Sequence, residues 1–127
     1  MAPQDSWPAL RGLSVEITGT QLRGQKSHPA SPWTRHTTEV VLTGPGSTCG
    51  LGEDVNYATP EQQAFQAEGL PPDVRAALLG HHTLESLAHR LDGVDSGPDL
   101  PRQPAARLYR RWALESAALD LALQQAG

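Results

Sequence analysis

Cysteine is almost missing from this chain of 127 residues, which contains only Cys49. A single cysteine excludes a disulfide within the chain and a zinc site built from several cysteines. Apolar runs are short, and none approaches the ~18 consecutive residues that a membrane-spanning helix needs. Residues 1–8 also lack the basic and apolar regions of a secretory signal peptide. The sequence therefore predicts a cytoplasmic protein with no membrane partner.

Basic residues and aromatic residues are also scarce. Lysine and arginine number 10 against 14 acidic residues, which gives a net charge of −4, and only 5% of residues are aromatic. Binding to nucleic acid requires a basic face, so we expect no nucleic-acid partner. The only dense basic group is Arg107, Arg110 and Arg111, which either binds an anion or forms ion pairs, for example with Glu115 one helical turn after Arg111.

Glycine and proline are plentiful, with 12 and 11 residues. Their combined share lies above the usual ~12% and below the ~25–30% typical of disordered chains. At this length we expect one domain with long loops and a modest core, or part of a larger domain.

The amino-terminal half carries the pattern of strands. After a polar leader, residues 1–12, apolar and polar residues alternate over Leu13–Ile17, which predicts a half-buried strand that can extend to Leu22. Residues 23–35 have no periodicity and contain two prolines, which indicates a long loop.

Two further strands are predicted after this loop. Residues 36–43 are rich in β-branched side chains, and the sequence Gly44-Pro45-Gly46 signals a turn. Residues 47–54 are predicted to return as a third strand, in which Gly50 and Gly52 indicate a bulge or a close approach of another backbone.

The period changes to that of a helix from Thr59 on. Residues 59–62 form a capping box with proline at the first helical position, and Gly69 can end that helix. A short helical turn is predicted over residues 74–79, and Thr83 is predicted to cap another helix. The strongest signal is a long helix over residues 105–126, which contain neither glycine nor proline.

This long helix has two apolar faces. One is a stripe of Leu108, Trp112, Leu119 and Leu123, and the other is a sector of Leu114, Ala117, Ala118 and Leu121. So wide an apolar surface usually has two partners, of which the sheet should be one. The order of elements predicts an α+β fold, in which a three-stranded antiparallel meander is followed by a helical bundle ending in the long helix.

Histidines and carboxylates offer two candidate sites of chemistry. The histidines are His81, His82 and His89, which could act as metal ligands, although a cap at Thr83 favours ordinary surface histidines. Glu53 and Asp54 could do acid–base work only in a pocket that shifts a pKa, and solvated charges beside a turn are commoner.

The loop over residues 23–35 has the composition of a lid over an anionic organic molecule. It combines a lysine, a histidine, a tryptophan and an arginine, namely Lys26, His28, Trp33 and Arg35. A plain surface loop is the alternative.

Three stretches together resemble the N-terminal capping domain of the enolase superfamily, in its mandelate racemase and muconate-lactonizing branch. They are the strand over residues 13–17 with its long loop, the hairpin over residues 37–43 leading into Cys49-Gly-Leu-Gly-Glu-Asp54, and Tyr109–Ala122 with its Ala-Leu-Glu and Asp-Leu-Ala motifs.

This resemblance implies a two-part enzyme in which residues 13–127 cap a (β/α) barrel. The barrel would hold Mg²⁺ and abstract a proton α to a carboxylate, as in a racemase, epimerase, cycloisomerase or dehydratase. The resemblance gives this chain no catalytic residue and no metal ligand, so the isolated chain should be silent. Residues 23–35 and 53–58 would close over a carboxylate-bearing substrate. The side chains predicted to face that substrate are Lys26, His28, Trp33 and Tyr57.

Without a barrel, the sector around Leu114 should be exposed, which predicts self-association. Two alternatives stay open. One is a stand-alone α+β binding or interaction module without enzymatic role. The other is a small hydrolase or metal-binding protein that gathers the three histidines and the Glu53-Asp54 pair in one pocket.

Overall fold

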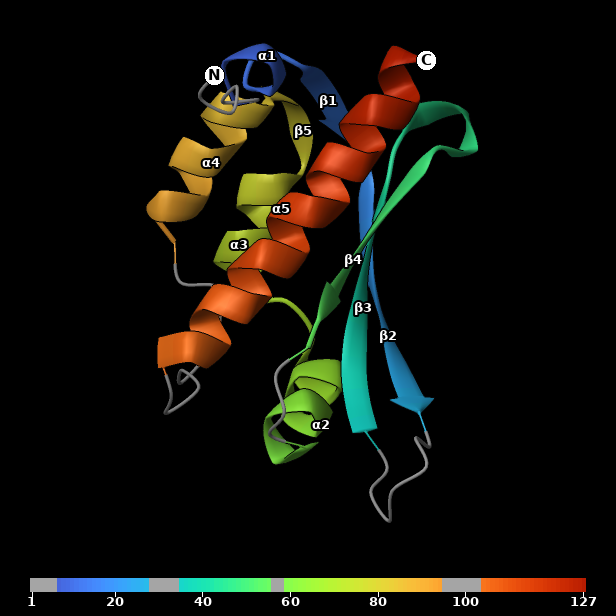
Figure 1. Ribbon diagram of the computed structural model, residues 1–127, viewed down its shortest axis with the longest axis vertical. Helices are drawn as coiled ribbons and strands as arrows, with labels where there is room; N and C mark the ends of the chain where they lie inside the picture. The colour runs from blue at the N-terminus through green and yellow to red at the C-terminus, as the bar shows by residue number, and fades with distance from the viewer. Residues whose placement is uncertain (1–6, 28–34, 56–58, 95–103) are drawn as a thin grey trace, which may run out of the picture.

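The computed structural model describes residues 7–27, 35–55, 59–94 and 104–127. These residues form an α+β fold with antiparallel strands and a long carboxy-terminal helix (Figure 1). The strands are β1 (Ser14–Ile17), β2 (Gly19–Ser27), β3 (Arg35–Thr43), β4 (Cys49–Asp54) and β5 (Gly80–Thr83). The helices are α1 (Trp7–Leu10), α2 (Thr59–Glu68), α3 (Pro72–Leu78), α4 (Leu84–Asp92) and α5 (Pro104–Ala126), and a 3₁₀ turn, η1, covers Pro45–Ser47.

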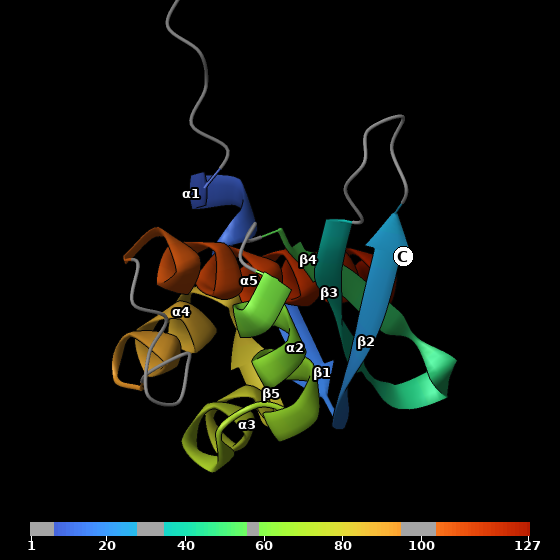
Figure 2. The ribbon, with the colours of Figure 1, turned by 90° about the horizontal axis from the view of Figure 1, so that it is seen from below.

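The strands form two antiparallel sheets. One has three strands in the order β2-β3-β4, and the other pairs β1 with β5. Figure 2 shows the three-stranded sheet on one side of the molecule and α2, α3 and α4 on the other. Helix α5 contacts β4, β3, β1 and α4, and it therefore lies at the centre of the packing.

The core is formed by the inner faces of these elements. Its buried members are Val15, Ile17, Val40, Leu42, Val74, Ala77, Leu78, Leu84, Leu87, Leu91, Ala113, Leu114, Ala117, Ala118, Leu121 and Ala122. Six of these lie on α5. Burial of this apolar surface is the main force that holds α5 against the strands.

The helix α5 approaches β4 so closely that β4 needs glycine at two positions. A Cβ atom on Gly52 would lie well within 3.0 Å of the Ala113 carbonyl oxygen, and one on Gly50 would overlap the backbone at Ala117. The predicted close approach of a backbone to these glycines is confirmed. The carboxylate of Asp120 also accepts a hydrogen bond of 2.9 Å from the backbone N–H of Leu51, so α5 covers the edge of β4 as well.

The predicted sheet differs from the observed one in its first strand. The alternating segment forms β1, with Val15 and Ile17 buried, but β1 pairs with β5 and not with β3. The strand that pairs with β3 is β2, which begins after Thr18 and continues to Ser27. Six residues of the predicted 23–35 loop are therefore strand, namely residues 23–27 in β2 and Arg35 in β3.

The predicted helix signals at Thr83 and Gly69 are confirmed. Thr83 caps α4 through a capping box, in which Ser86 N–H donates to Thr83 Oγ1 at 3.1 Å and Thr83 N–H donates to Ser86 Oγ at 3.0 Å. Gly69 follows α2 with a φ of 76° and donates its N–H to Phe65 at 2.8 Å. A positive φ is readily adopted by glycine, which explains why the helix ends there.

The end of α5 is fixed to β1 by the side chain of Gln125. Its amide oxygen accepts from the Glu16 backbone N–H, and its amide nitrogen donates to the Glu16 carbonyl oxygen, both at 2.8 Å. The side chain thus satisfies both backbone groups of one strand residue, as a neighbouring strand would.

Replacing Gln125 with alanine is expected to lower the free energy of unfolding by about 1–3 kcal/mol, because two hydrogen bonds are lost and two backbone groups lose their partners. Gln124→Ala is the matched control, since Gln124 only donates to Asp120 on the exposed surface of the same helix. Urea unfolding of both variants measures the difference. Equal stability of the two variants would contradict the role assigned to Gln125.

Candidate functional site

Of the four side chains predicted to face a substrate, the described residues include Lys26. Lys26 is exposed on β2, opposite His36 of β3. The other three, His28, Trp33 and Tyr57, lie outside the described residues.

His81, His82 and His89 do not converge on one site. His81 is exposed and lies 3.3 Å from the Glu16 carboxylate, whereas His82 is buried with its Nε2 2.8 Å from the carbonyl oxygen of Leu78. His89 is exposed on α4. In the part of the chain that the structure describes, no group of three histidine, cysteine or acidic side chains is placed to hold a metal.

The Glu53-Asp54 pair is divided between the two faces of β4. Glu53 is exposed, whereas the side chain of Asp54 is only 1% exposed and pairs with Arg110, which is 5% exposed, at a distance of 3.4 Å. The guanidinium carbon of Arg110 also lies 3.8 Å from the centre of the Phe65 ring. Arg110 of α5 thus contacts both Asp54 of β4 and Phe65 of α2, and the ion pair is buried from solvent.

Polar side chains of α2 connect the buried Asp54–Arg110 pair to the sheet. Gln62 donates to the backbone oxygen of Asp54 at 2.9 Å and accepts from the Thr38 hydroxyl at 2.6 Å. Gln66 donates to Thr38 Oγ1 at 2.9 Å and to the Thr37 carbonyl at 3.1 Å. The cluster is thus a network that ties α2 to β3 and β4.

Among the described residues, Arg110 and Arg111 of the basic group form ion pairs. Besides the pair made by Arg110, Arg111 contacts Glu115 within α5 and Asp92 of α4 at 3.0 Å. The predicted pairing of Arg111 with Glu115 is confirmed. Arg107 is exposed.

The two apolar faces of α5 have the opposite roles to those predicted. The sector around Leu114 and Leu121 is fully buried against the strands and was wrongly predicted to be exposed. The face left exposed is the other one, called here the α5 stripe: Leu108, Trp112, Leu119 and Leu123. Within it, Leu108, Trp112 and Leu123 are 47%, 51% and 49% exposed, and Leu119 is half-buried.

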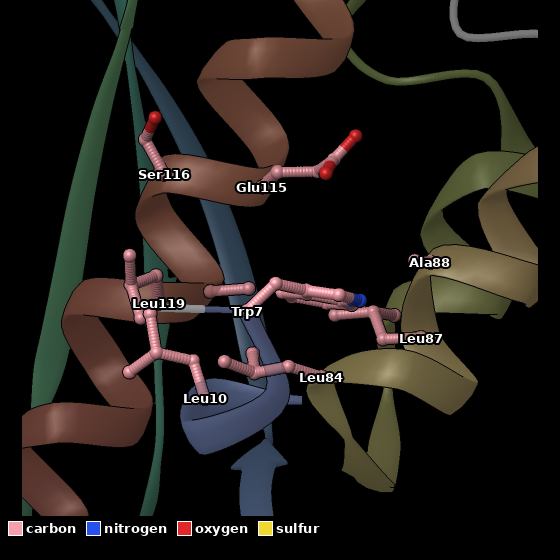
Figure 3. Close-up of a pocket in the computed structure, with 9 residues that line it drawn as sticks. Trp7, Leu10, Leu84, Leu87, Ala88, Glu115, Ser116 and Leu119 are labelled. Atoms are coloured by element: carbon pink, nitrogen blue, oxygen red, sulfur yellow. The ribbon is translucent and has the colours of Figure 1, made fainter. Parts of the chain in front are cut away.

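An apolar groove lies beside this stripe, between α1, α4 and α5 (Figure 3). Its volume is about 170 Å³. The residues that line it are Trp7, Leu10, Leu84, Leu87, Ala88, Glu115, Ser116, Ala118 and Leu119. The groove was not predicted from the sequence, because Trp7 and Leu10 lie in the polar leader. Trp7 was the one residue that indicated packing of the leader on the domain.

The walls of the groove are fixed by polar contacts. Arg111 of α5 donates to the Ala88 carbonyl oxygen at 3.0 Å and so holds α4 in place. The first N–H groups of α4, those of Leu84 and Glu85, donate to the carbonyl oxygens of Leu13 and Arg11 at 3.0 Å. The groove is therefore formed before any partner binds.

Comparison with protein families identifies the chain by one match. A family model described as "Domain of unknown function (DUF8230) N-terminal domain" matches residues 8–127. The chain belongs to the DUF8230 N-terminal domain family. No curated protein and no solved structure matches it. Among the described residues of this DUF8230 N-terminal domain, no helix has the length and apolar character to cross a bilayer.

The predicted membership of the enolase superfamily is wrong, because the family that matches is DUF8230. The residues that carried the resemblance have a packing role in this DUF8230 domain. Gly50 and Gly52 accommodate the backbone of α5, and the small residues of Tyr109–Ala122 allow that approach. The expected barrel, its Mg²⁺ and its carboxylate substrate followed from that resemblance alone.

Proposed function

We propose that this chain is an interaction domain that docks, through the α5 stripe, on a following segment of its own polypeptide. The observation that carries the proposal is the row of half-exposed Leu108, Trp112 and Leu123 along one side of the longest helix. Single exposed apolar residues are ordinary, but three large ones along one side of a helix favour a surface for a partner. At a rise of ~1.5 Å per residue, the stripe extends about 22 Å.

The aromatic residues of α5 support this choice of surface. Trp112 packs edge to face on Tyr109, with ring centroids 5.7 Å apart and an angle of 74° between the planes. Tryptophan and tyrosine are enriched at interfaces, where a fixed aromatic side chain often contributes much of the affinity. Two of the few aromatic residues of the chain thus lie together on the proposed surface.

The family description supports the choice of partner. A unit described as an N-terminal domain is one that precedes another part of the same polypeptide. Such a domain needs no catalytic residue of its own. A second copy of the chain is the competing partner, and the same experiment distinguishes the two.

Hydroxyl-radical footprinting tests the proposal in the 127-residue chain and in the polypeptide extended beyond Gly127. In the extended polypeptide, oxidation of Trp112 and Leu123 is expected to fall to the level of buried Leu121. Leu51 is the matched control, since it is 41% exposed and alternates with Gly50 and Gly52, so it points away from α5. Its oxidation should stay unchanged.

Three outcomes contradict the proposal. Equal oxidation of Trp112 in both polypeptides would mean that the following segment does not cover the stripe. A stop codon directly after Gly127 would remove the partner. Protection that appears in the isolated chain and rises with its concentration would assign the stripe to a second copy.

A further inference from the structure

The α1–α4–α5 groove adjoins the proposed docking surface. Leu119 lines the groove and also belongs to the α5 stripe, so a partner on the stripe meets the groove directly. Figure 3 shows Trp7 lying between Leu119 of α5 and Leu87 of α4. A partner that covers the stripe alone would leave this apolar hollow unfilled, and unfilled apolar space forfeits packing energy.

We infer that the groove receives one neutral, apolar side chain of the same following segment; this inference rests on the proposed function. The size of the groove indicates the class of side chain. An apolar cavity of ~150 Å³ holds a benzene molecule. The groove, at about 170 Å³, has room for one aromatic ring or one branched aliphatic group.

The charges around the groove favour a neutral occupant. Glu115 is the acidic residue of the lining, and its carboxylate already pairs with Arg111. The lining is otherwise apolar except for Ser116. A cationic side chain would lose its hydration in the apolar groove, and Glu115, which is half-exposed and already pairs with Arg111, would repay little of that loss.

The fixed walls make the groove suitable as an anchor site. Because Arg111 and the turn after α1 already hold α4, binding orders few additional groups. Low ordering cost and full removal of an apolar group from water are the properties of interface hot spots. The groove residue should therefore contribute more to docking than any single contact along the stripe.

Small aromatic probes test the groove in the 127-residue chain. Benzyl alcohol is expected to shift the NMR signals of the Trp7 indole N–H and the Leu84 methyls in a saturable way, and benzylamine to shift them less. Ala88→Phe, which fills the groove from α4, should abolish the shift. His89→Phe, on the exposed side of the same helix, is the matched control and should keep it. Ser116→Phe closes the groove from its exposed rim and serves if Ala88→Phe does not fold.

Footprinting of the extended polypeptide completes the test. Trp7 is expected to be protected there, and Ala88→Phe or Ser116→Phe should remove this protection. Protection of Trp112 without probe binding and without a change at Trp7 would overturn the groove inference and leave the proposed function standing. Probe binding without protection of Trp112 would overturn the proposed function. It would then also rule out a side chain of the following segment as the group that fills the groove. Equal binding of benzylamine would overturn the requirement for a neutral group.

Discussion

Replacing Gly52 with alanine is expected to lower the free energy of unfolding by more than about 3 kcal/mol, although only one methyl group is added. In an ordinary strand this substitution is favourable, because glycine loses more backbone entropy than alanine on folding. Here the new Cβ would fall within 3.0 Å of the carbonyl group of Ala113 and the backbone nitrogen of Ala117. Backbone atoms inside a helix cannot rotate away, so α5 would have to move off β4 and lose its core contacts.

Chemical denaturation followed by circular dichroism measures this loss. Gly12→Ala is the matched control, because nothing lies within 4 Å of the added methyl, and its effect should stay within about 0.5 kcal/mol. Adding Ala113→Gly to Gly52→Ala should restore little, since the clash is with the backbone of residue 113. A Gly52→Ala variant as stable as Gly12→Ala would mean that the helix is not held at this distance.

The parts of the fold that could be predicted from the sequence are those fixed by neighbouring residues. The run of β-branched residues predicts β3, and Thr83 and Gly69 predict the ends of two helices. These predictions hold because caps and turn conformations depend on side chains only a few residues apart. The continuous run of helix formers likewise gave α5 nearly to the residue.

The missed strands lack an apolar pattern. In β5, which reads Gly-His-His-Thr, only His82 is buried, and its pairing partner β1 lies more than 60 residues earlier. The end of β2 from Arg23 to Lys26 is exposed on both faces, so no alternation marks it. Both strands exist because of a partner strand, and a partner strand is not visible in local sequence.

The two faces of α5 could be recognised from the sequence, but their roles could not be assigned. Hydrophobicity favours the stripe with Trp112 for burial, since its side chains are the larger. The structure buries the sector with Ala117 and Ala118, because small residues let α5 approach Gly50 and Gly52. Which face is buried is decided by fit to the strand, and this requires knowing which strand the helix meets. The groove beside the stripe depends on the same three-dimensional placement.

Arg110→Met is expected to lower the free energy of unfolding by about 3–5 kcal/mol, because it leaves the carboxylate of Asp54 buried without its guanidinium partner. Methionine keeps an apolar contact with the Phe65 ring, so the loss should come chiefly from the charge. Asp54→Asn should have a cost of similar size, since Arg110 would then be a buried cation beside a neutral amide. The matched control is the pair of exposed Arg23 and half-buried Glu39, where Arg23→Met should cost about 0–1 kcal/mol.

A double-mutant cycle separates the pair from the rest of the network. If the cost of each single variant is an isolated buried charge, the double variant Asp54→Asn with Arg110→Met contains neither charge. Its loss should be smaller than the sum of the two single losses by about 1–3 kcal/mol. Losses that simply add would show that Asp54 and Arg110 stabilise the domain independently, through Gln62 and the Phe65 ring respectively. A coupled result would show that Asp54 and Arg110 act as one ion pair between β4 and α5.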